Sequence, residues 1–91
     1  MLLVTDVGNT TTVYGVYQDE ALVARWCVST DPAKTVDELG TTLAMFLQYQ
    51  GIALGEIKGM AIASVVPTLL PKLVTMAQSY LRVEPVVLDR E

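Results

Sequence analysis

The sequence lacks the residues from which many metal and nucleophile sites are built. It contains no histidine, and Cys27 is its only cysteine. A zinc site or a Cys–His nucleophile therefore cannot be assembled from these residues, and no internal disulfide can form. We interpret Cys27 as a small buried hydrophobic residue of a protein in a reducing compartment.

Long apolar runs, basic clusters and two common nucleotide motifs are also missing. No run approaches the ~20 apolar residues of a membrane span, and the start of the chain does not resemble a signal peptide. The six basic residues are scattered in a chain of net charge −4, which disfavours nucleic acid as a partner. Neither a Walker loop nor a Gly-x-Gly-x-x-Gly motif is present. We expect a cytoplasmic protein that binds neither membrane nor nucleic acid.

Hydrophobic residues, in contrast, are abundant. They make up 52% of the 91 residues, and charged residues make up 18%. This content is sufficient for a hydrophobic core and argues against intrinsic disorder. The length allows one domain at most.

Three segments in the amino-terminal part are predicted to be β-strands joined by short turns. Residues 2–7 form a mostly apolar run that ends at a turn, and residues 11–17 are rich in β-branched and aromatic side chains. Residues 21–28 alternate as a strand does, and their predicted apolar face carries Leu22, Ala24, Trp26 and Val28.

The spacing of apolar residues then becomes helical. The first predicted helix has its cap near Thr35 and stops at Gly51, and its apolar face carries Val36, Leu39, Leu43, Phe46 and Leu47. A buried strand over residues 59–66 follows. A second helix capped by Thr68 comes next, and residues 85–88 form a last short strand.

The predicted order is therefore β-β-β-α-β-α-β. A meander followed by right-handed crossovers gives an α/β domain with a mixed sheet and the first strand near its centre. This is the order of the ribonuclease H-like fold, which actin, sugar kinases and heat-shock ATPases share. Such a fold does not by itself determine the function.

The clearest chemical signal is the segment Asp6-Val7-Gly8-Asn9-Thr10-Thr11-Thr12, at the end of the first predicted strand. Gly8 has no side chain, so backbone there can approach a phosphate oxygen closely. Amides and hydroxyls of residues 9–12 can donate hydrogen bonds to phosphate, and Asp6 can hold Mg²⁺ through water. From spacing alone, an ordinary hairpin turn remains an equal alternative, because Gly and Asn both tolerate positive φ.

Four stretches of the chain resemble type III pantothenate kinases, which belong to the acetate and sugar kinase, heat-shock and actin superfamily. Gly8-Asn9-Thr10 followed by further threonine is similar to the first phosphate motif of that family. The other similar stretches are Trp26 with Ser29-Thr30-Asp31, Thr35-Val36-Asp37-Glu38, and Ser64-Val65-Val66-Pro67. The resemblance covers essentially the whole chain in order and spacing. Two mild departures, Lys34 in place of Arg and Ala63 in place of Ser, lie outside the phosphate motif.

The resemblance implies ATP-dependent phosphorylation of pantothenate to 4′-phosphopantothenate, the first step of coenzyme A synthesis. It also implies Mg²⁺, a monovalent cation such as K⁺ or NH₄⁺, and a homodimer. Carried over to this sequence, Asp6 would position Mg²⁺ and the phosphates. The residues that would bind the phosphates are Gly8, Asn9, Thr10 and Thr11.

The resemblance also implies that residues 1–91 are an incomplete amino-terminal ribonuclease H-like ATPase domain. The family's catalytic Gly-x-Asp-Arg motif, its second phosphate loop and its carboxylate for the monovalent cation do not occur in the sequence. We therefore expect a second domain to be missing, and these residues alone to be inactive.

Two other roles share part of this pattern. The family includes proteins described as Bvg accessory factors, so a non-catalytic actin-like regulatory or binding module stays open as the alternative. A ribonuclease H-type nuclease is disfavoured, because Asp6 and Glu38 could supply carboxylates but the fourth strand ends in Ser64.

The remaining singled-out residues have structural interpretations. Asp37 and Glu38 are expected to stabilise the start of the first helix. Ser64 and Pro67 are expected to form a tight turn or to line a ligand-binding cleft at the end of the fourth strand. The core or a dimer surface is expected to contain Met45, Phe46, Tyr49, Met76 and Tyr80.

Overall fold

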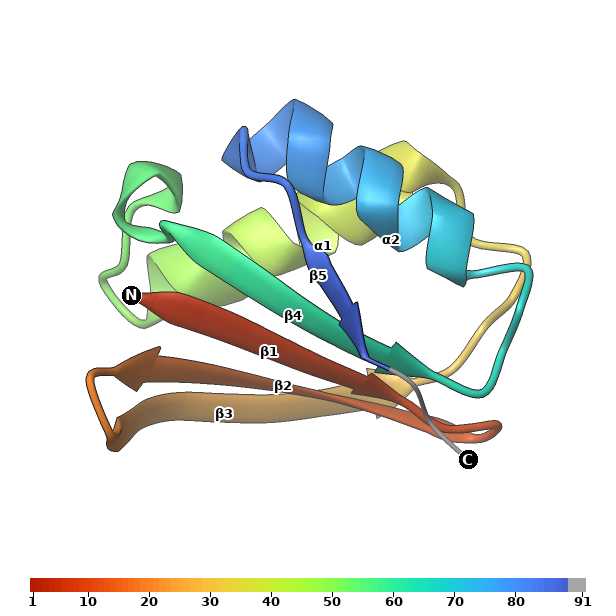
Figure 1. Cartoon of the computed structure of the whole chain (residues 1–91), viewed down its shortest axis with the longest axis horizontal. Helices are drawn as coiled ribbons and strands as arrows, with labels where there is room; N and C mark the ends of the chain where they lie inside the picture. The colour runs from red at the N-terminus through yellow and green to blue at the C-terminus, as the bar shows by residue number, and fades with distance from the viewer. Residues whose placement is uncertain (89–91) are drawn as a thin grey trace.

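The computed structural model describes residues 1–88, which form a five-stranded mixed sheet of order β3-β2-β1-β4-β5 (Figure 1). Strand β1 is antiparallel to β2 and parallel to β4, so the first strand lies at the centre as predicted. Strands β2 and β3 pair antiparallel, and β4 and β5 pair parallel. The strands are β1 Leu2–Val7, β2 Thr11–Gln18, β3 Ala21–Ser29, β4 Gly59–Ser64 and β5 Val86–Leu88. The predicted ribonuclease H-like order is confirmed.

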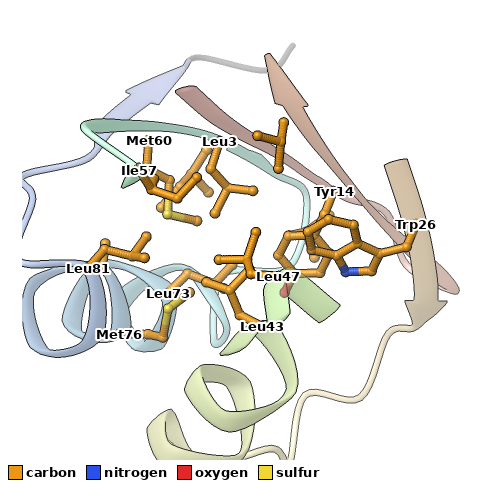
Figure 2. Packing of buried hydrophobic residues seen from close by; sticks show 14 of the residues in the cluster. Leu3, Tyr14, Trp26, Leu43, Leu47, Ile57, Met60, Leu73, Met76 and Leu81 are labelled. Carbon is orange, nitrogen blue, oxygen red and sulfur yellow. The ribbon is translucent and has the colours of Figure 1, made fainter. Parts of the chain in front are cut away.

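Two α-helices, α1 (Val36–Tyr49) and α2 (Leu70–Met76), cover one face of this sheet (Figure 1). A short 3₁₀ helix, Leu54–Glu56, was not predicted. The hydrophobic core lies between the helices and the sheet, where Leu43, Leu73 and Leu3 come from three different elements (Figure 2). The helical face of the sheet is therefore buried.

Helix α1 begins and ends as the sequence predicted. The Thr35 hydroxyl accepts from the Glu38 amide at 3.1 Å, and the Glu38 carboxylate accepts from the Thr35 amide at 3.0 Å. This capping box satisfies two amides at the helix start, and its bonds from Thr35 hold the pKa of Glu38 below its usual value. At the other end, Gly51 has a φ of 74°, which favours glycine.

Helix α2 differs from its prediction at its start. Thr68 does not cap it, because Leu69 already has helical φ and ψ and donates its amide to Val66 in a preceding turn. A cap residue needs extended backbone to present its side chain to the helix start. The helix continues as a π-helical turn, Ala77–Leu81, and ends at Arg82 with a φ of 56°.

A β-bulge in the meander corrects the predicted face of Leu22. Val16 pairs with Ala24, whereas Tyr17 pairs with Leu22, so the register shifts by one residue between them. The shift moves Leu22 to the face opposite Ala24, where it is 50% exposed.

Cys27 is exposed, so the prediction that it is buried was wrong. It pairs with Val13, and strand alternation directs both side chains to the face opposite Trp26. Within residues 1–88, helices α1 and α2 pack only on the Trp26 face (Figure 1).

The large side chains assigned to the core or a dimer surface divide into two groups. Met76 is fully buried, and Phe46 and Tyr80 pack against the core. Met45 and Tyr49, in contrast, are 70% and 87% exposed on α1. The first three residues therefore belong to the core. For Met45 and Tyr49 the dimer surface is the alternative that stays a prediction.

Candidate phosphate-binding site

The candidate site is the loop of residues 8–10 between β1 and β2 together with Thr11, the first residue of β2; these four residues are called the β1–β2 loop below. It follows the carboxyl end of β1, where Val7 pairs with Thr12 on one side and with Ser64 on the other. The Val65 amide donates to the Val7 carbonyl at 3.0 Å. Ligands of open α/β sheets bind at such strand ends, so the loop is well placed for a phosphate.

Asp6 lies one residue before the end of β1, on the sheet face opposite the helices. Its neighbours Thr5 and Val7 are buried beneath the helices, and the Asp6 side chain is exposed. It borders a shallow hollow that Val13 and Arg25 also line. The carboxylate is therefore accessible beside the loop, as its predicted role requires.

Gly8 is required by a close approach of backbone. A Cβ atom at this position would lie 3.0 Å from the Thr11 carbonyl oxygen, which already accepts from the Gly8 amide at 2.9 Å. Neither Gly8 nor Asn9 has a positive φ. Tolerance of positive φ therefore does not explain these two residues, although the loop does close a hairpin.

The side chains of the predicted donor stretch fall into two groups. Asn9, Thr10 and Thr11 are exposed, so their side chains can reach a ligand. Thr12 is only 4% exposed, and its hydroxyl lies 2.8 Å from the hydroxyl of Thr30. Thr12 differs from the other three because it occupies a buried position of β2, where its hydroxyl is engaged with Thr30.

Thr30 is the residue of the site whose contacts sequence reasoning missed. Its hydroxyl donates to the Gly8 carbonyl at 2.8 Å, and its amide donates to the Thr10 carbonyl at 2.9 Å. The only signal in the sequence is the buried position of Thr12, whose hydroxyl requires a partner. Nothing in the spacing identifies Thr30 as that partner.

Ser64 forms a turn at the end of β4. Its hydroxyl accepts from the Val66 amide at 3.0 Å, and this local bond turns the chain toward α2. The turn is one of the two predicted roles of this segment. Val65, at the tip of the turn, is 40% exposed near the β1–β2 loop.

A cavity of about 280 Å³ lies on the helical side of the sheet. It is lined by Thr12 and Tyr14 from β2, by Thr30 and Lys34 from the segment after β3, and by the first turns of α1 and α2. Lys72 holds this segment by donating to the carbonyls of Pro32 and Lys34, both at 2.8 Å. Burial raises the pKa of Tyr14 to about 12.

This pKa predicts a loss of stability at alkaline pH. The folded protein holds Tyr14 neutral, so the stabilisation is complete below pH 10 and is lost as pH rises to about 12. The expected loss is about 2–3 kcal/mol. Urea unfolding at about pH 9 and about pH 11, an interval that covers about half of this loss, should show a smaller decline in Tyr14→Phe than in the wild type. An equal decline of the free energy of unfolding in the two proteins would show that Tyr14 is not the cause.

Within residues 1–88, no group of three or more His, Cys, Asp or Glu side chains is arranged to hold a metal ion. A metal at Asp6 would therefore take its other ligands from phosphate and water, or from other parts of a larger protein. The described helices include none that is long and apolar enough to cross a membrane.

The chain is similar in sequence to type III pantothenate kinases. The sequence profile of that family matches residues 2–91. Type III pantothenate kinase 2 of Symbiobacterium thermophilum is 45% identical over 87 residues, which cover 96% of this chain and 33% of that protein. The type III pantothenate kinase of Finegoldia magna is 40% identical over 91 residues, covering 100% and 35%. The chain thus spans about a third of the length of these relatives.

Solved structures share the fold at lower sequence identity. A ROK hexokinase from Thermus thermophilus has a TM-score of 0.70 and 10% identity, and it matches 96% of this chain and 34% of its own. A candidate N-acetylglucosamine kinase from Porphyromonas gingivalis has a TM-score of 0.67 and 21% identity, with the same coverage. At these identities, the likeness establishes the fold alone.

Proposed function

Because this chain belongs to the type III pantothenate kinase family, we propose that the protein carrying it transfers the γ-phosphoryl group of ATP to pantothenate. The product is 4′-phosphopantothenate, and the reaction is the first step of coenzyme A synthesis. The observation that carries this proposal is the exposed Asp6 carboxylate beside the β1–β2 loop, at the end of the central strand.

In this proposal the β1–β2 loop binds the phosphates of ATP. The exposed donors are the side chains of Asn9, Thr10 and Thr11. The Gly8 amide already donates to the Thr11 carbonyl, so the part proposed for Gly8 is its lack of a side chain, which lets backbone approach a phosphate oxygen closely. Phosphoryl transfer depends mostly on positioning and on neutralising charge, so a loop of this kind is a central part of the machinery.

Asp6 fits a role in holding Mg²⁺. Mg²⁺ keeps several waters and is commonly bound by one or two carboxylates together with substrate phosphates. One exposed carboxylate next to a phosphate loop satisfies this requirement without a larger acidic cluster. When bound, Mg²⁺ would neutralise charge that develops on the phosphates.

Four further features are proposed from the family alone. They are a monovalent cation such as K⁺ or NH₄⁺, a homodimer, a catalytic base in a second domain, and pantothenate-binding residues outside this chain. Residues 1–91 then form an amino-terminal ribonuclease H-like domain that is inactive by itself.

The proposed function is tested by ADP release from a full-length protein containing these residues. With ATP, Mg²⁺ and K⁺ present, release should depend on added pantothenate, and the isolated residues 1–91 should release none. Omitting K⁺ or replacing it with NH₄⁺ tests the monovalent cation. A folded full-length protein that binds ATP but releases no ADP with pantothenate would refute the kinase proposal and favour a non-catalytic module.

A further inference from the structure

We propose that Thr30 is a positioning residue that orients the β1–β2 loop toward the phosphates of ATP. This inference rests on the proposed role of the loop in binding phosphate. Thr30 directly follows β3 and contacts the loop through both its backbone and its side chain. It is partly buried on the helical side of the sheet, whereas Asp6 lies on the opposite side.

The direction of the hydroxyl hydrogen bonds follows from counting protons. A threonine hydroxyl has one proton to donate, and the Thr30 hydroxyl donates its proton to the Gly8 carbonyl at 2.8 Å. The contact of 2.8 Å between the hydroxyls of Thr30 and Thr12 must therefore be donated by Thr12. The result is a directed chain from Thr12 through Thr30 to the carbonyl of Gly8.

This chain determines which way the peptide between Gly8 and Asn9 faces. The described backbone contains no cis peptide bond, so the carbonyl and the amide of this peptide point in opposite directions. Because the Gly8 carbonyl points at Thr30, the Asn9 amide points away from it.

The backbone of Thr30 orients a second peptide, the one between Thr10 and Thr11. Its amide donates to the Thr10 carbonyl at 2.9 Å, so the Thr11 amide also points away from Thr30. Both amides are thus oriented before a ligand arrives. Amides oriented in advance bind an anion without the cost of ordering the loop at that moment.

Nucleotide binding to the full-length protein tests this role without depending on turnover. Thr30→Val keeps the shape of the side chain and the backbone bond to Thr10 but removes the hydroxyl. We expect its Kd for ATP to rise roughly 10-fold, because the Gly8 carbonyl loses its donor and the peptide between Gly8 and Asn9 loses its fixed orientation. Affinity for adenosine, which has no phosphate, should stay within about 2-fold.

Two variants separate positioning from general structural damage. Thr30→Ser restores the hydroxyl and should bring the ATP Kd back to within about 3-fold of the wild type. Thr41→Val is the matched control, because that hydroxyl donates to the Asp37 carbonyl within α1, away from the loop. If Thr30→Val does not fold, Thr30→Ala removes the same hydroxyl with a smaller side chain and should show the same selective loss.

Three outcomes of the binding series overturn the inference. An unchanged ATP Kd in Thr30→Val, equal weakening of ATP and adenosine, or failure of Thr30→Ser to restore binding would each do so. A wild type that binds no ATP overturns this inference together with the proposed function. A wild type that binds ATP but does not phosphorylate pantothenate overturns the proposed function alone, and the binding series still decides the role of Thr30.

Discussion

Asp6→Asn is expected to lower kcat/KM for ATP by about 100-fold or more in the full-length protein. The substitution keeps the shape of the side chain and removes its negative charge, so the proposed Mg²⁺ would lose a ligand and its orientation. Loss of one group that stabilises charge in a transition state typically reduces the rate by about 10²–10³-fold. Steady-state kinetics with ATP and Mg²⁺ varied independently should show the loss, together with a higher Mg²⁺ requirement.

Asp19→Asn provides the matched control. Asp19 is also exposed, and it lies in the turn between β2 and β3, at the end of β2 away from the β1–β2 loop. Its φ of 56° is well tolerated by asparagine. The control should keep wild-type kinetics, and both variants should unfold within about 1 kcal/mol of the wild type. Wild-type kinetics in a folded Asp6→Asn would exclude a role for this carboxylate in metal binding.

Gly40→Ala is expected to destabilise the protein by about 1–2 kcal/mol, although alanine is the better helix former. In an exposed helix the substitution would stabilise by about 1 kcal/mol. Here a Cβ atom would lie 2.4–2.6 Å from three ring atoms of Tyr80. The ring would have to move and would strain or lose the 2.7 Å bond that its hydroxyl donates to Asp37. Urea unfolding measures the difference.

Removing the ring should reverse the sign of this effect. A Tyr80→Ala background removes the three atoms nearest to the new methyl group, so Gly40→Ala should stabilise there by up to about 1 kcal/mol. Gly55→Ala is the control, because a Cβ there meets no atom within 4 Å. Destabilisation of the same size in both backgrounds would show that contact with Tyr80 is not the cause.

The sequence predicted the strand order because the signals for it are local. The apolar run of residues 2–7 and the capping box at Thr35 each act within a few residues, and both appear where expected. The bulge beside Leu22 was missed because a register shift depends on how two strands pair. Likewise, the contact between Gly40 and Tyr80 joins residues from two helices, and no period in either helix reveals it.

The candidate site likewise has one part that could be predicted from the sequence and another that could not. Asp6, Gly8 and Asn9 are neighbours in the chain, so their arrangement at the end of β1 could be predicted from one segment. Thr30 is 22 residues from Gly8, and only the folded meander brings its hydroxyl under the loop. The exposed Cys27 was mispredicted because burial was assigned from residue type, whereas the two helices cover only the other face of the sheet.

The stacking of Trp26 gives this region an optical reporter. It is the only tryptophan of the sequence, it is 8% exposed, and its ring stacks on Tyr14 at 5.4 Å and on Phe46 at 5.1 Å. Trp26 lies on β3, the strand that leads into Thr30. Within this chain, the emission wavelength and the energy transfer from tyrosine therefore report on the packing that supports the β1–β2 loop.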